Sequence, residues 1–408
     1  MKGRVEVRIL VLVTLALVAF GLVMVYSATS AAAALGDGDP SYYLKRQGIY
    51  AVLGICGLLV ASRFDFHGLR ALAPGLLVFS LVLCTLVLLA PPINGARRWF
   101  TLGPAAFQPS ELAKLSLAIW AAAYLARRKA PQTLGELARP VGVVAGLFCL
   151  LILAGRDLGT AIALVVMLFG LLLVSGVPLR TLGAGTALIG TMGVLAIAAE
   201  PYRRERFLSF LDPWSDPQGS GFQIIQALIG LGSGGVFGEG LGQGVQKIFY
   251  LPEAHTDMIF AIVGEELGLL GTTAVILAYA AFGYAGLRIA LACKDPFGKR
   301  LAAALTILVC GQAAINLAAV LALAPLTGIP LPFVSYGGSN LVVQLASVGI
   351  LLNIAANGSR ARASVSDRSR GHGRARAAGA GGRGRAAGRG RRDDLRRVAG
   401  ARRGAARP

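Results

Sequence analysis

Long runs of apolar residues, separated by short polar segments, fill the first 357 residues of the chain. An α-helix needs about 20 apolar residues to cross a hydrocarbon core roughly 30 Å thick. About ten runs come close to this length, some of them with the help of flanking residues. They are residues 9–28, 48–61, 69–89, 112–126, 141–154, 158–174, 182–199, 258–292, 301–324 and 341–356. The pattern predicts an all-α, polytopic membrane bundle of about ten transmembrane helices.

The longest stretch between apolar runs covers residues 200–256, between the seventh and eighth predicted helices. Within it, residues 222–231 are apolar and predict a short helix, and residues 232–244 are rich in glycine. Long loops on a rigid scaffold are where binding and catalytic residues concentrate. We therefore expect a functional site in or beside this segment.

The composition narrows the class of protein. Hydrophobic residues make up 55% of the chain and charged residues 15%, whereas soluble domains carry about 25% charged residues. This balance excludes a soluble globular enzyme. The five cysteines and three histidines are scattered along the chain, so neither a disulfide framework nor a zinc site is predicted.

Charge divides the chain into a body, residues 1–357, and a tail, residues 358–408. From residue 359 onward the tail holds 16 arginines against three aspartates, with many glycines and alanines. Such a segment cannot bury enough apolar surface to fold alone, so we predict that it is disordered. We expect it to contact anionic lipid headgroups or a protein partner rather than nucleic acid.

The lysines and arginines of the loops predict how the bundle is oriented. With the N-terminus inside, 14 basic residues of the body fall inside and nine outside, in line with the positive-inside rule. Both termini are therefore expected in the cytoplasm, and residues 200–256 outside. The first apolar run follows three basic residues, as in a signal peptide, but its length favours a retained anchor.

Ionisable residues within membrane helices are costly and are functional candidates by default. Glu111 and Lys114 share one helical face at the start of the fourth run. Either they form an internal salt bridge, or Lys114 faces a polar cavity and binds an anionic ligand while Glu111 orients it. Glu265 and Glu266 lie about two turns inside the eighth run, and we expect them to have interior partners.

Residues 94–109 form a short outside loop that contains Arg97, Arg98 and Trp99. Arginines in a small outside loop run against the positive-inside trend. Their presence favours a role in binding an anion such as phosphate. Trp99 suits either an interfacial anchor or a platform for a sugar ring.

Asp257 ends the long outside segment where the eighth run begins. We predict that Thr256 is the N-cap of this helix and that Asp257 lies in its first turn, where the helix dipole favours an ionised carboxylate. Such a carboxylate can act as a general base on a substrate hydroxyl, or it can merely support the helix start. Residues 331–340 combine prolines with paired glycines, which predicts a hinge or a ligand-facing turn.

These segments resemble the signature blocks of the SEDS proteins, the family of shape, elongation, division and sporulation. The blocks are residues 94–99, 107–114, 157–160, 246–257, 264–268 and 332–339, in the order typical of the family. Residues 246–255 are more similar to the division branch than to the elongation branch. Arg156, Met258 and Asn340 depart from the proline, phenylalanine and serine usual at these positions, and none of these changes removes a proposed catalytic group.

The resemblance implies a ten-helix peptidoglycan glycosyltransferase that polymerises lipid II, working with a class B penicillin-binding transpeptidase and other division proteins. Asp257 matches the family's catalytic aspartate, which would take the proton of the acceptor GlcNAc 4-hydroxyl as it attacks MurNAc C1 and expels polyprenyl pyrophosphate. No cofactor or metal ligand is assigned, although the chemistry leaves room for a divalent cation. The candidate substrate-binding residues are Arg97, Arg98, Trp99, Glu111, Lys114, Lys247, Glu253, His255 and Ser335.

Other functions also fit a polytopic bundle with broken helices. A transporter that flips lipid-linked precursors needs polar groups accessible from both faces, whereas the candidates here gather on the outside. A non-catalytic scaffold for division leaves the outside carboxylate and cationic groups without a role. Among polymerases, an elongation-type enzyme is the alternative to a septal one.

Overall fold

The computed structural model describes residues 4–34, 39–93, 95–103, 105–199, 201–248 and 251–358. Asn94 and the predicted disordered tail after residue 358 lie outside these ranges. Each of the ten apolar runs forms a helix, which confirms the predicted all-α membrane bundle. The ten helices are α1 (Arg4–Ala34), α2 (Tyr42–Arg63), α3 (Phe66–Leu86), α4 (Pro109–Ala126), α6 (Val143–Ala154), α7 (Leu158–Val174), α8 (Leu179–Ala199), α11 (Ile259–Ala292), α12 (Pro296–Val320) and α13 (Gly338–Asn357).

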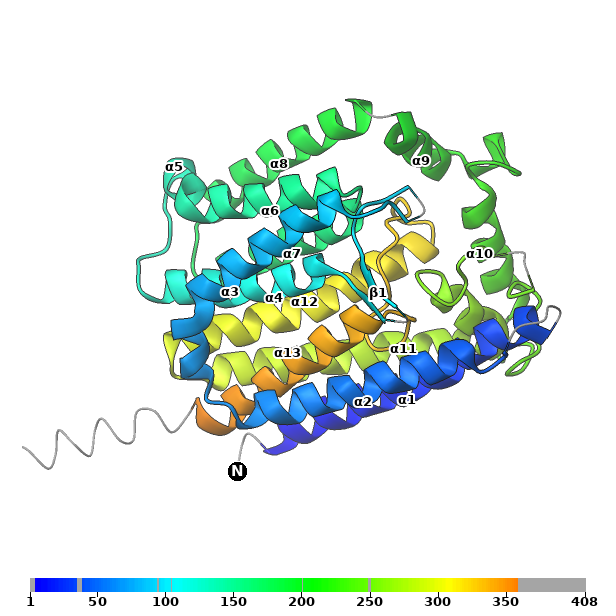
Figure 1. Cartoon of the computed structure of the whole chain (residues 1–408), viewed down its shortest axis with the longest axis horizontal. Helices are drawn as coiled ribbons and strands as arrows, with labels where there is room; N and C mark the ends of the chain where they lie inside the picture. Colours follow the sequence, from blue (N-terminus) through cyan, green and yellow to red (C-terminus); the bar gives the residue numbers. More distant parts are fainter. Residues whose placement is uncertain are drawn as a thin grey trace, which may run out of the picture. The chain divides into compact units, whose positions relative to one another are not determined.

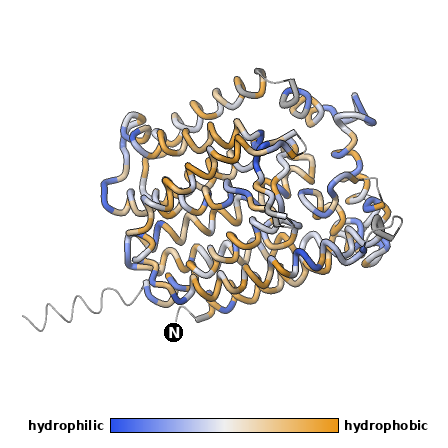
Figure 2. Tube along the Cα trace, viewed as in Figure 1, coloured by the Kyte–Doolittle hydropathy of each residue, from blue (hydrophilic) through white to orange (hydrophobic). Residues whose placement is uncertain are grey.

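Seven helices in the described part of the chain are both long and apolar enough to cross a membrane. They are α1, α2, α3, the segment from α5 (Leu134–Leu137) through a π-helical turn (Ala138–Gly142) to α6, and α11, α12 and α13. The other three runs form α4, which contains Glu111 and Lys114, and the apolar helices α7 and α8. Hydrophobic residues extend along the helices, while hydrophilic residues gather near their ends (Figure 2).

The core of the bundle lies around α12 and α13, the most deeply buried of the candidate spans. α12 packs against α4, α7 and α11, and α13 packs against α2 (Figure 1). A Cβ atom at Gly349 of α13 would collide with the carbonyl oxygen of Leu58 in α2. Glycine at this position therefore allows the two backbones to approach closely, as small residues do in membrane helix pairs.

The first and last helices begin and end on the same side of the bundle (Figure 1). Arg288 Nε near the end of α11 lies 3.8 Å from Glu6 Oε1 of α1. The amide of Lys294 donates to the carbonyl oxygen of Gly358, just after α13, at 3.4 Å. The two ends of the described body thus lie on one side, as an even number of membrane spans requires.

Short elements gather at the opposite end of the bundle. α10 (Phe222–Ser233) confirms the predicted short helix, while α9 (Pro201–Leu211) and a 3₁₀ turn (Pro213–Ser215) were not predicted. The loop before α4 contains an antiparallel hairpin of β1 (Phe100–Leu102) and β2 (Ala105–Phe107), with Phe100 opposite Phe107. A 3₁₀ turn (Val87–Leu89) follows α3.

α11 is broken at Gly268, which has φ 64° and ψ −159°, a conformation open essentially to glycine alone. The segment before α11 satisfies backbone groups that the break releases. The amide of Glu239 donates to Glu265 O at 2.9 Å, and the amide of Leu269 donates to Gly235 O at 2.9 Å. Residues 235–240 thus hydrogen-bond to the broken part of α11. Irregular backbone at membrane depth needs such partners inside the protein.

The predicted start of α11 is wrong by two residues. The N-cap is Met258, not Thr256, and Asp257 precedes the helix instead of lying in its first turn. The Thr256 hydroxyl donates to Glu253 O at 2.9 Å, within a run of turns over residues 251–258. The amide of Thr256 also donates to Glu253 O, at 2.8 Å, so the backbone of Thr256 belongs to this turn and the helix starts only after it.

Candidate active site

Asp257 lies where two irregular segments meet, the turns of residues 251–257 and the segment 321–337 between α12 and α13. Its side chain is half-buried, and Oδ1 accepts a hydrogen bond from Thr256 Oγ1 at 3.1 Å. Its backbone carbonyl accepts one from Asn316 Nδ2 of α12 at 2.7 Å. A Cβ atom at Gly328 would lie 4.0 Å from Asp257 Oδ2. The carboxylate therefore faces the second segment at a position that carries no side chain.

A cavity of about 390 Å³ lies beside these two segments, within the range of about 300–1,000 Å³ common for small-molecule sites. Pro252 of the turns and Leu326 of the second segment contribute to one wall, and α9, α10 and the residues between them form the other. Gln223 Nε2 of α10 donates to Pro252 O at 3.4 Å. The residues that line the cavity are Glu205, Ser209, Gly219, Ser220, Phe222, Gln223, Pro252 and Leu326.

These lining residues were not predicted from the sequence, although all of them except Leu326 fall in residues 200–256, where a site was expected. They combine hydroxyl, amide and carboxylate groups with the apolar faces of Phe222 and Leu326. Such a mixture suits a sugar ring, which has both hydroxyl groups and apolar C–H faces. The cavity therefore has the chemistry of a carbohydrate site, and Pro252 in its lining belongs to the same run of turns as Asp257.

His255 packs into an aromatic cluster beside Asp257. Its ring centroid lies 4.4 Å from that of Tyr43 in α2 and 5.5 Å from that of Tyr336. The amide of Tyr336 donates to His255 O at 2.9 Å, which joins the two irregular segments. Burial lowers the pKa of His255 to about 4 and raises that of Tyr336 to about 12. Both rings are therefore neutral near pH 7.

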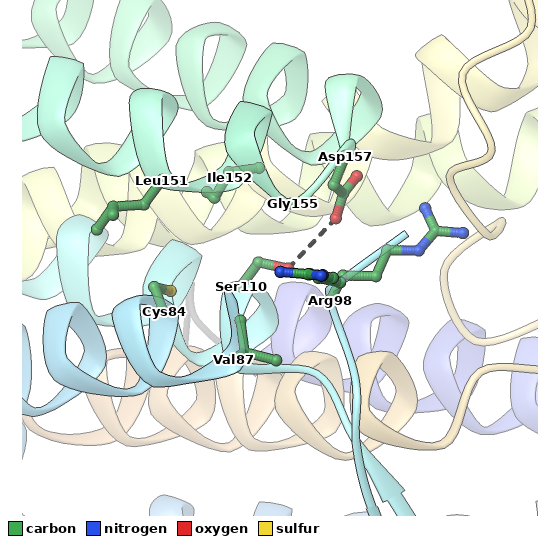
Figure 3. Close-up of a pocket in the computed structure, with 9 residues that line it drawn as sticks. Cys84, Val87, Arg98, Ser110, Leu151, Ile152, Gly155 and Asp157 are labelled. Atoms are coloured by element: carbon green, nitrogen blue, oxygen red, sulfur yellow. Dashed lines mark hydrogen bonds between the residues drawn. The ribbon is translucent and has the colours of Figure 1, made fainter. Parts of the chain in front are cut away.

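Arg97 and Arg98 line a small pocket at the same end of the bundle (Figure 3). Arg97 is exposed, and its Nη1 donates to Leu88 O at 3.1 Å, while Arg98 is half-buried. Arg156, at the turn between α6 and α7, donates from Nη1 to Gly95 O at 3.2 Å. Three arginines from two loops are thus brought together, a concentration of positive charge that suits an anion such as phosphate.

Asp157 forms the opposite wall of this pocket, where Ser110 and Asp157 face each other (Figure 3). It caps α7, because Oδ1 accepts from the Thr160 amide at 3.0 Å. Oδ2 accepts from Gln108 Nε2 at 2.8 Å and from Ser110 Oγ at 3.4 Å. With 4% of its surface exposed, Asp157 is a structural carboxylate that fixes the start of α7.

Glu111 and Lys114 form the internal salt bridge that was one of the two predicted alternatives, with 2.9 Å between Lys114 Nζ and Glu111 Oε1. Lys114 also donates to Gln312 Oε1 of α12 at 2.8 Å, and Asn340 Nδ2 of α13 donates to Glu111 Oε2 at 2.9 Å. Both charged side chains are buried. The pair joins α4, α12 and α13 from within.

Lys247 and Glu266 form a second buried pair, with 2.6 Å between Nζ and Oε1. Ser27 of α1 donates to both Glu266 oxygens at 2.7 Å. Glu265 accepts from the amide of Val245 at 2.7 Å. The expected interior partners of Glu265 and Glu266 are therefore confirmed, and Lys247 is occupied inside the protein rather than presented to a ligand.

The remaining predicted residues occupy different environments. Glu253 is exposed and adopts a positive φ of 53° in the turns before Asp257. Trp99 is half-buried just before β1. Ser335 is buried, and its hydroxyl accepts from the Leu331 amide at 2.8 Å, so it stabilises the segment between α12 and α13 from within. Among the predicted residues, Glu253 and His255 share the turns of Asp257, whereas Arg97 and Arg98 form the separate arginine pocket.

Within the described residues, no group of three or more histidine, cysteine, aspartate or glutamate side chains is placed to hold a metal ion. The carboxylates at this end of the bundle are used singly. Asp157 is bonded to α4 and α7, and Asp257 lies at the two irregular segments. A divalent cation therefore has no preformed cluster of protein ligands in this part of the chain.

The fold and the site define a polytopic α-helical membrane protein with a half-buried carboxylate on a run of turns that also lines a cavity at one end of its bundle. The model of the FtsW, RodA and SpoVE family, described as cell cycle protein, matches residues 7–360. The chain belongs to this family, which confirms the resemblance to SEDS proteins.

Individual relatives agree with the family. The chain is 40% identical over 353 residues to the probable peptidoglycan glycosyltransferase FtsW of Geobacter sp. (strain M18), covering 85% of this chain and 96% of that protein. It is 39% identical over 354 residues to the stage V sporulation protein E of Bacillus subtilis (strain 168), covering 85% and 96%.

Solved structures share the fold. A chain from work titled "Structural coordination of polymerization and crosslinking by a peptidoglycan synthase complex" superposes with a TM-score of 0.71 and 33% identity, covering 86% of this chain and 97% of that one. The rod shape determining protein RodA of Thermus thermophilus superposes with a TM-score of 0.62 and 29% identity, covering 86% and 96%.

Proposed function

We propose that this protein is a peptidoglycan glycosyltransferase that joins the disaccharide units of lipid II into glycan strands at the outer face of the bacterial cytoplasmic membrane. The observation that carries the proposal is the half-buried Asp257 carboxylate, at two irregular segments that also line a cavity of about 390 Å³. The relatives named FtsW support the same reaction and a role in septal wall synthesis.

In the proposed reaction Asp257 accepts the proton of the acceptor GlcNAc 4-hydroxyl. The hydroxyl oxygen forms a bond to C1 of the donor MurNAc while the bond from C1 to the pyrophosphate oxygen breaks. Polyprenyl pyrophosphate leaves with the bonding electron pair, and the configuration at C1 is inverted. A positioned general base contributes roughly 10²- to 10⁴-fold to such a step.

The departing pyrophosphate gains negative charge, and stabilising that charge is the larger part of the task. We assign this role to the arginine pocket of Arg97 and Arg98, with Arg156 nearby. Lys114 and Lys247 are less suited to it, because buried glutamates already pair with them. They support the site by fixing the elements around it.

The proposal places both termini in the cytoplasm and Asp257 outside. The same-side ends of the described body and the excess of basic residues predicted on the inside support this orientation. A peptidoglycan synthase complex that polymerises and crosslinks provides the model for a class B penicillin-binding transpeptidase as partner. The partner would supply crosslinking, and this chain would supply polymerisation.

The test is to incubate the purified protein, with its co-expressed transpeptidase, with lipid II and to separate the glycan products on a gel. Wild-type protein is expected to form polymer, and Asp257→Asn protein is expected to form it at least about 100-fold more slowly. Polymer from the variant at the wild-type rate would contradict the general-base assignment. Absence of polymer from both well-folded proteins would instead favour transport or scaffolding.

A further inference from the structure

We propose that Asn316 is a positioning residue that holds Asp257 in place for the reaction, an inference that rests on the proposed function. Asn316 lies in α12 and is buried, with 2% of its surface exposed. Its Nδ2 group donates to Asp257 O at 2.7 Å and to Ile329 O at 2.8 Å. One amide thus joins the turns that contain Asp257 to the segment that faces the carboxylate.

Two hydrogen-bonded links between the two segments stand out among the described residues. Neither is helical at the contact, and no side chain caps the start of α11 after Asp257. Irregular backbone is held by its hydrogen bonds rather than by a helical ladder. The amide of Tyr336 bonded to His255 O provides a second link, on the aromatic side of Asp257. Asn316 provides the link at Asp257 itself.

The α12 helix anchors this link rigidly. Gln312, one helical turn before Asn316, donates from Nε2 to Pro330 O at 3.0 Å, the carbonyl next to that of Ile329. Its Oε1 accepts from Lys114 Nζ at 2.8 Å and from Gln344 Nε2 at 3.1 Å. The Glu111–Lys114 pair therefore supports the wall opposite Asp257 through Gln312, and Asn316 extends this network to Asp257.

Placement of a general base matters for rate because the base must lie within hydrogen-bond reach of the proton that it removes. A displacement of about 1 Å can lower a rate roughly 10²-fold. Removing the Asn316 amide would release the Asp257 carbonyl and let the turns shift, while the cavity lining on α9 and α10 stays in place. We therefore expect kcat to fall and KM to change little.

The experiment compares Asn316→Ala with Gln344→Ala in the full-length protein with its co-expressed transpeptidase. Gln344 is a matched control, because it is a buried amide in the same network and its Nε2 donates to Gln312 Oε1 of α12. We expect Asn316→Ala to lower kcat for lipid II by about 10- to 100-fold with KM within twofold, and Gln344→Ala to lower kcat by less than threefold. Equal losses in the two variants would overturn the assignment.

A second measurement does not depend on activity. Ala254 is buried within the turns before Asp257, so a cysteine introduced as Ala254→Cys should react slowly with a membrane-impermeant maleimide. Asn316→Ala should speed this labelling at least fivefold, and Gln344→Ala should leave it unchanged. The parent protein without Ala254→Cys gives the background.

Unchanged labelling in Asn316→Ala would refute the positioning role, whether or not lipid II is polymerised. Failure of the wild type to polymerise lipid II, with labelling as expected, would refute the proposed function alone.

Discussion

Two aspartates stand immediately before or at the start of apolar helices at the same end of the bundle, and the protein uses them differently. Asp157 caps α7, and both of its carboxylate oxygens accept hydrogen bonds from neighbouring elements while the side chain is buried. Asp257 precedes α11 without capping it and is half-buried, and the α12 amide holds its backbone carbonyl.

The difference shows how a fold can prepare a reactive carboxylate. A side chain that caps a helix is committed to structure, since its oxygens satisfy backbone amides. A residue held through its backbone carbonyl, as Asp257 is, keeps its place without its carboxylate serving as the helix cap. Cap geometry therefore separates a structural aspartate from a catalytic candidate more sharply than its position in the sequence does.

The strongest test of this comparison replaces each aspartate by asparagine. Asp257→Asn is expected to lower the initial rate of lipid II polymerisation by roughly 10²- to 10⁴-fold, because asparagine cannot accept the proton. The rate is measured from glycan products on a gel, and the thermal unfolding midpoint in detergent should stay near that of the wild type. If Asp257→Asn is inactive and its thermal unfolding midpoint also falls well below that of the wild type, Asp257 has a structural role like that of Asp157.

The next test addresses the buried network between the two aspartates. Lys114→Met leaves Glu111 charged and buried without its partner, which typically costs about 3–5 kcal/mol. We expect a large fall in the thermal unfolding midpoint in detergent. The double variant Glu111→Gln with Lys114→Met should recover part of the loss. Normal stability together with a raised KM for lipid II would instead indicate that Lys114 binds the substrate directly.

The aromatic cluster beside Asp257 gives a pH-dependent effect. The folded protein holds the pKa of His255 at about 4, against an ordinary value near 6.5, so the unfolded chain binds a proton first as the pH falls. The contribution of His255 to the free energy of unfolding is greatest above pH 6.5. It decreases as the pH falls from 6.5 to 4, and below pH 4 it no longer changes. The loss at pH 5 is roughly 2 kcal/mol.

The matched variant for this prediction is His255→Gln, which has no titrating ring. Thermal unfolding in detergent at pH 7.5 and pH 5 should show a larger drop for the wild type than for the variant. Equal drops in the two proteins would mean that other groups cause the acid sensitivity, and the Asp257 region would then contribute no pH dependence of its own through His255.

The smallest expected effect is that of Asp157→Asn, the matched partner of Asp257→Asn. Asparagine caps a helix about as well as aspartate does, and the neighbouring Gln108 amide can turn to present its oxygen. We expect a stability loss of about 1 kcal/mol or less, with polymerisation within threefold of the wild type. A loss as large as that of Asp257→Asn would erase the distinction between the two residues.

The sequence predicted the bundle well, because each span is a long apolar run and such runs have few alternatives in a membrane. It also located Asp257, Glu111 and Lys114, since charged residues at the edge of apolar runs are conspicuous. It left open whether Lys114 is paired or binds a ligand. The pairing depends on Gln312 and Asn340, which lie about 200 and 230 residues away in sequence.

The same limit explains the misassigned start of α11 and the missed cavity. Thr256 is a residue type common at N-caps, but its backbone amide donates to Glu253 O in a turn that precedes the helix. The roles of Gln223 and Asn316 arise from contacts with Pro252 and Asp257 that local patterns do not encode. Lys247 resembles a surface cation in sequence, and only the packing of α1 against α11 brings Ser27 and Glu266 to it.

The break in α11 at Gly268 constrains how the family can diverge. Residues 235–240 run beside the break, and the amides of Leu269 and Leu270 donate to the carbonyls of Gly235 and Val236 at 2.9 and 3.2 Å. Adding or deleting one residue there would put every later donor opposite the wrong acceptor. Residues 212–221, which contain a 3₁₀ turn and bends, have no such register with a membrane helix. Natural length variation in this segment should therefore accumulate before α10, while the stretch beside Gly268 keeps a fixed length.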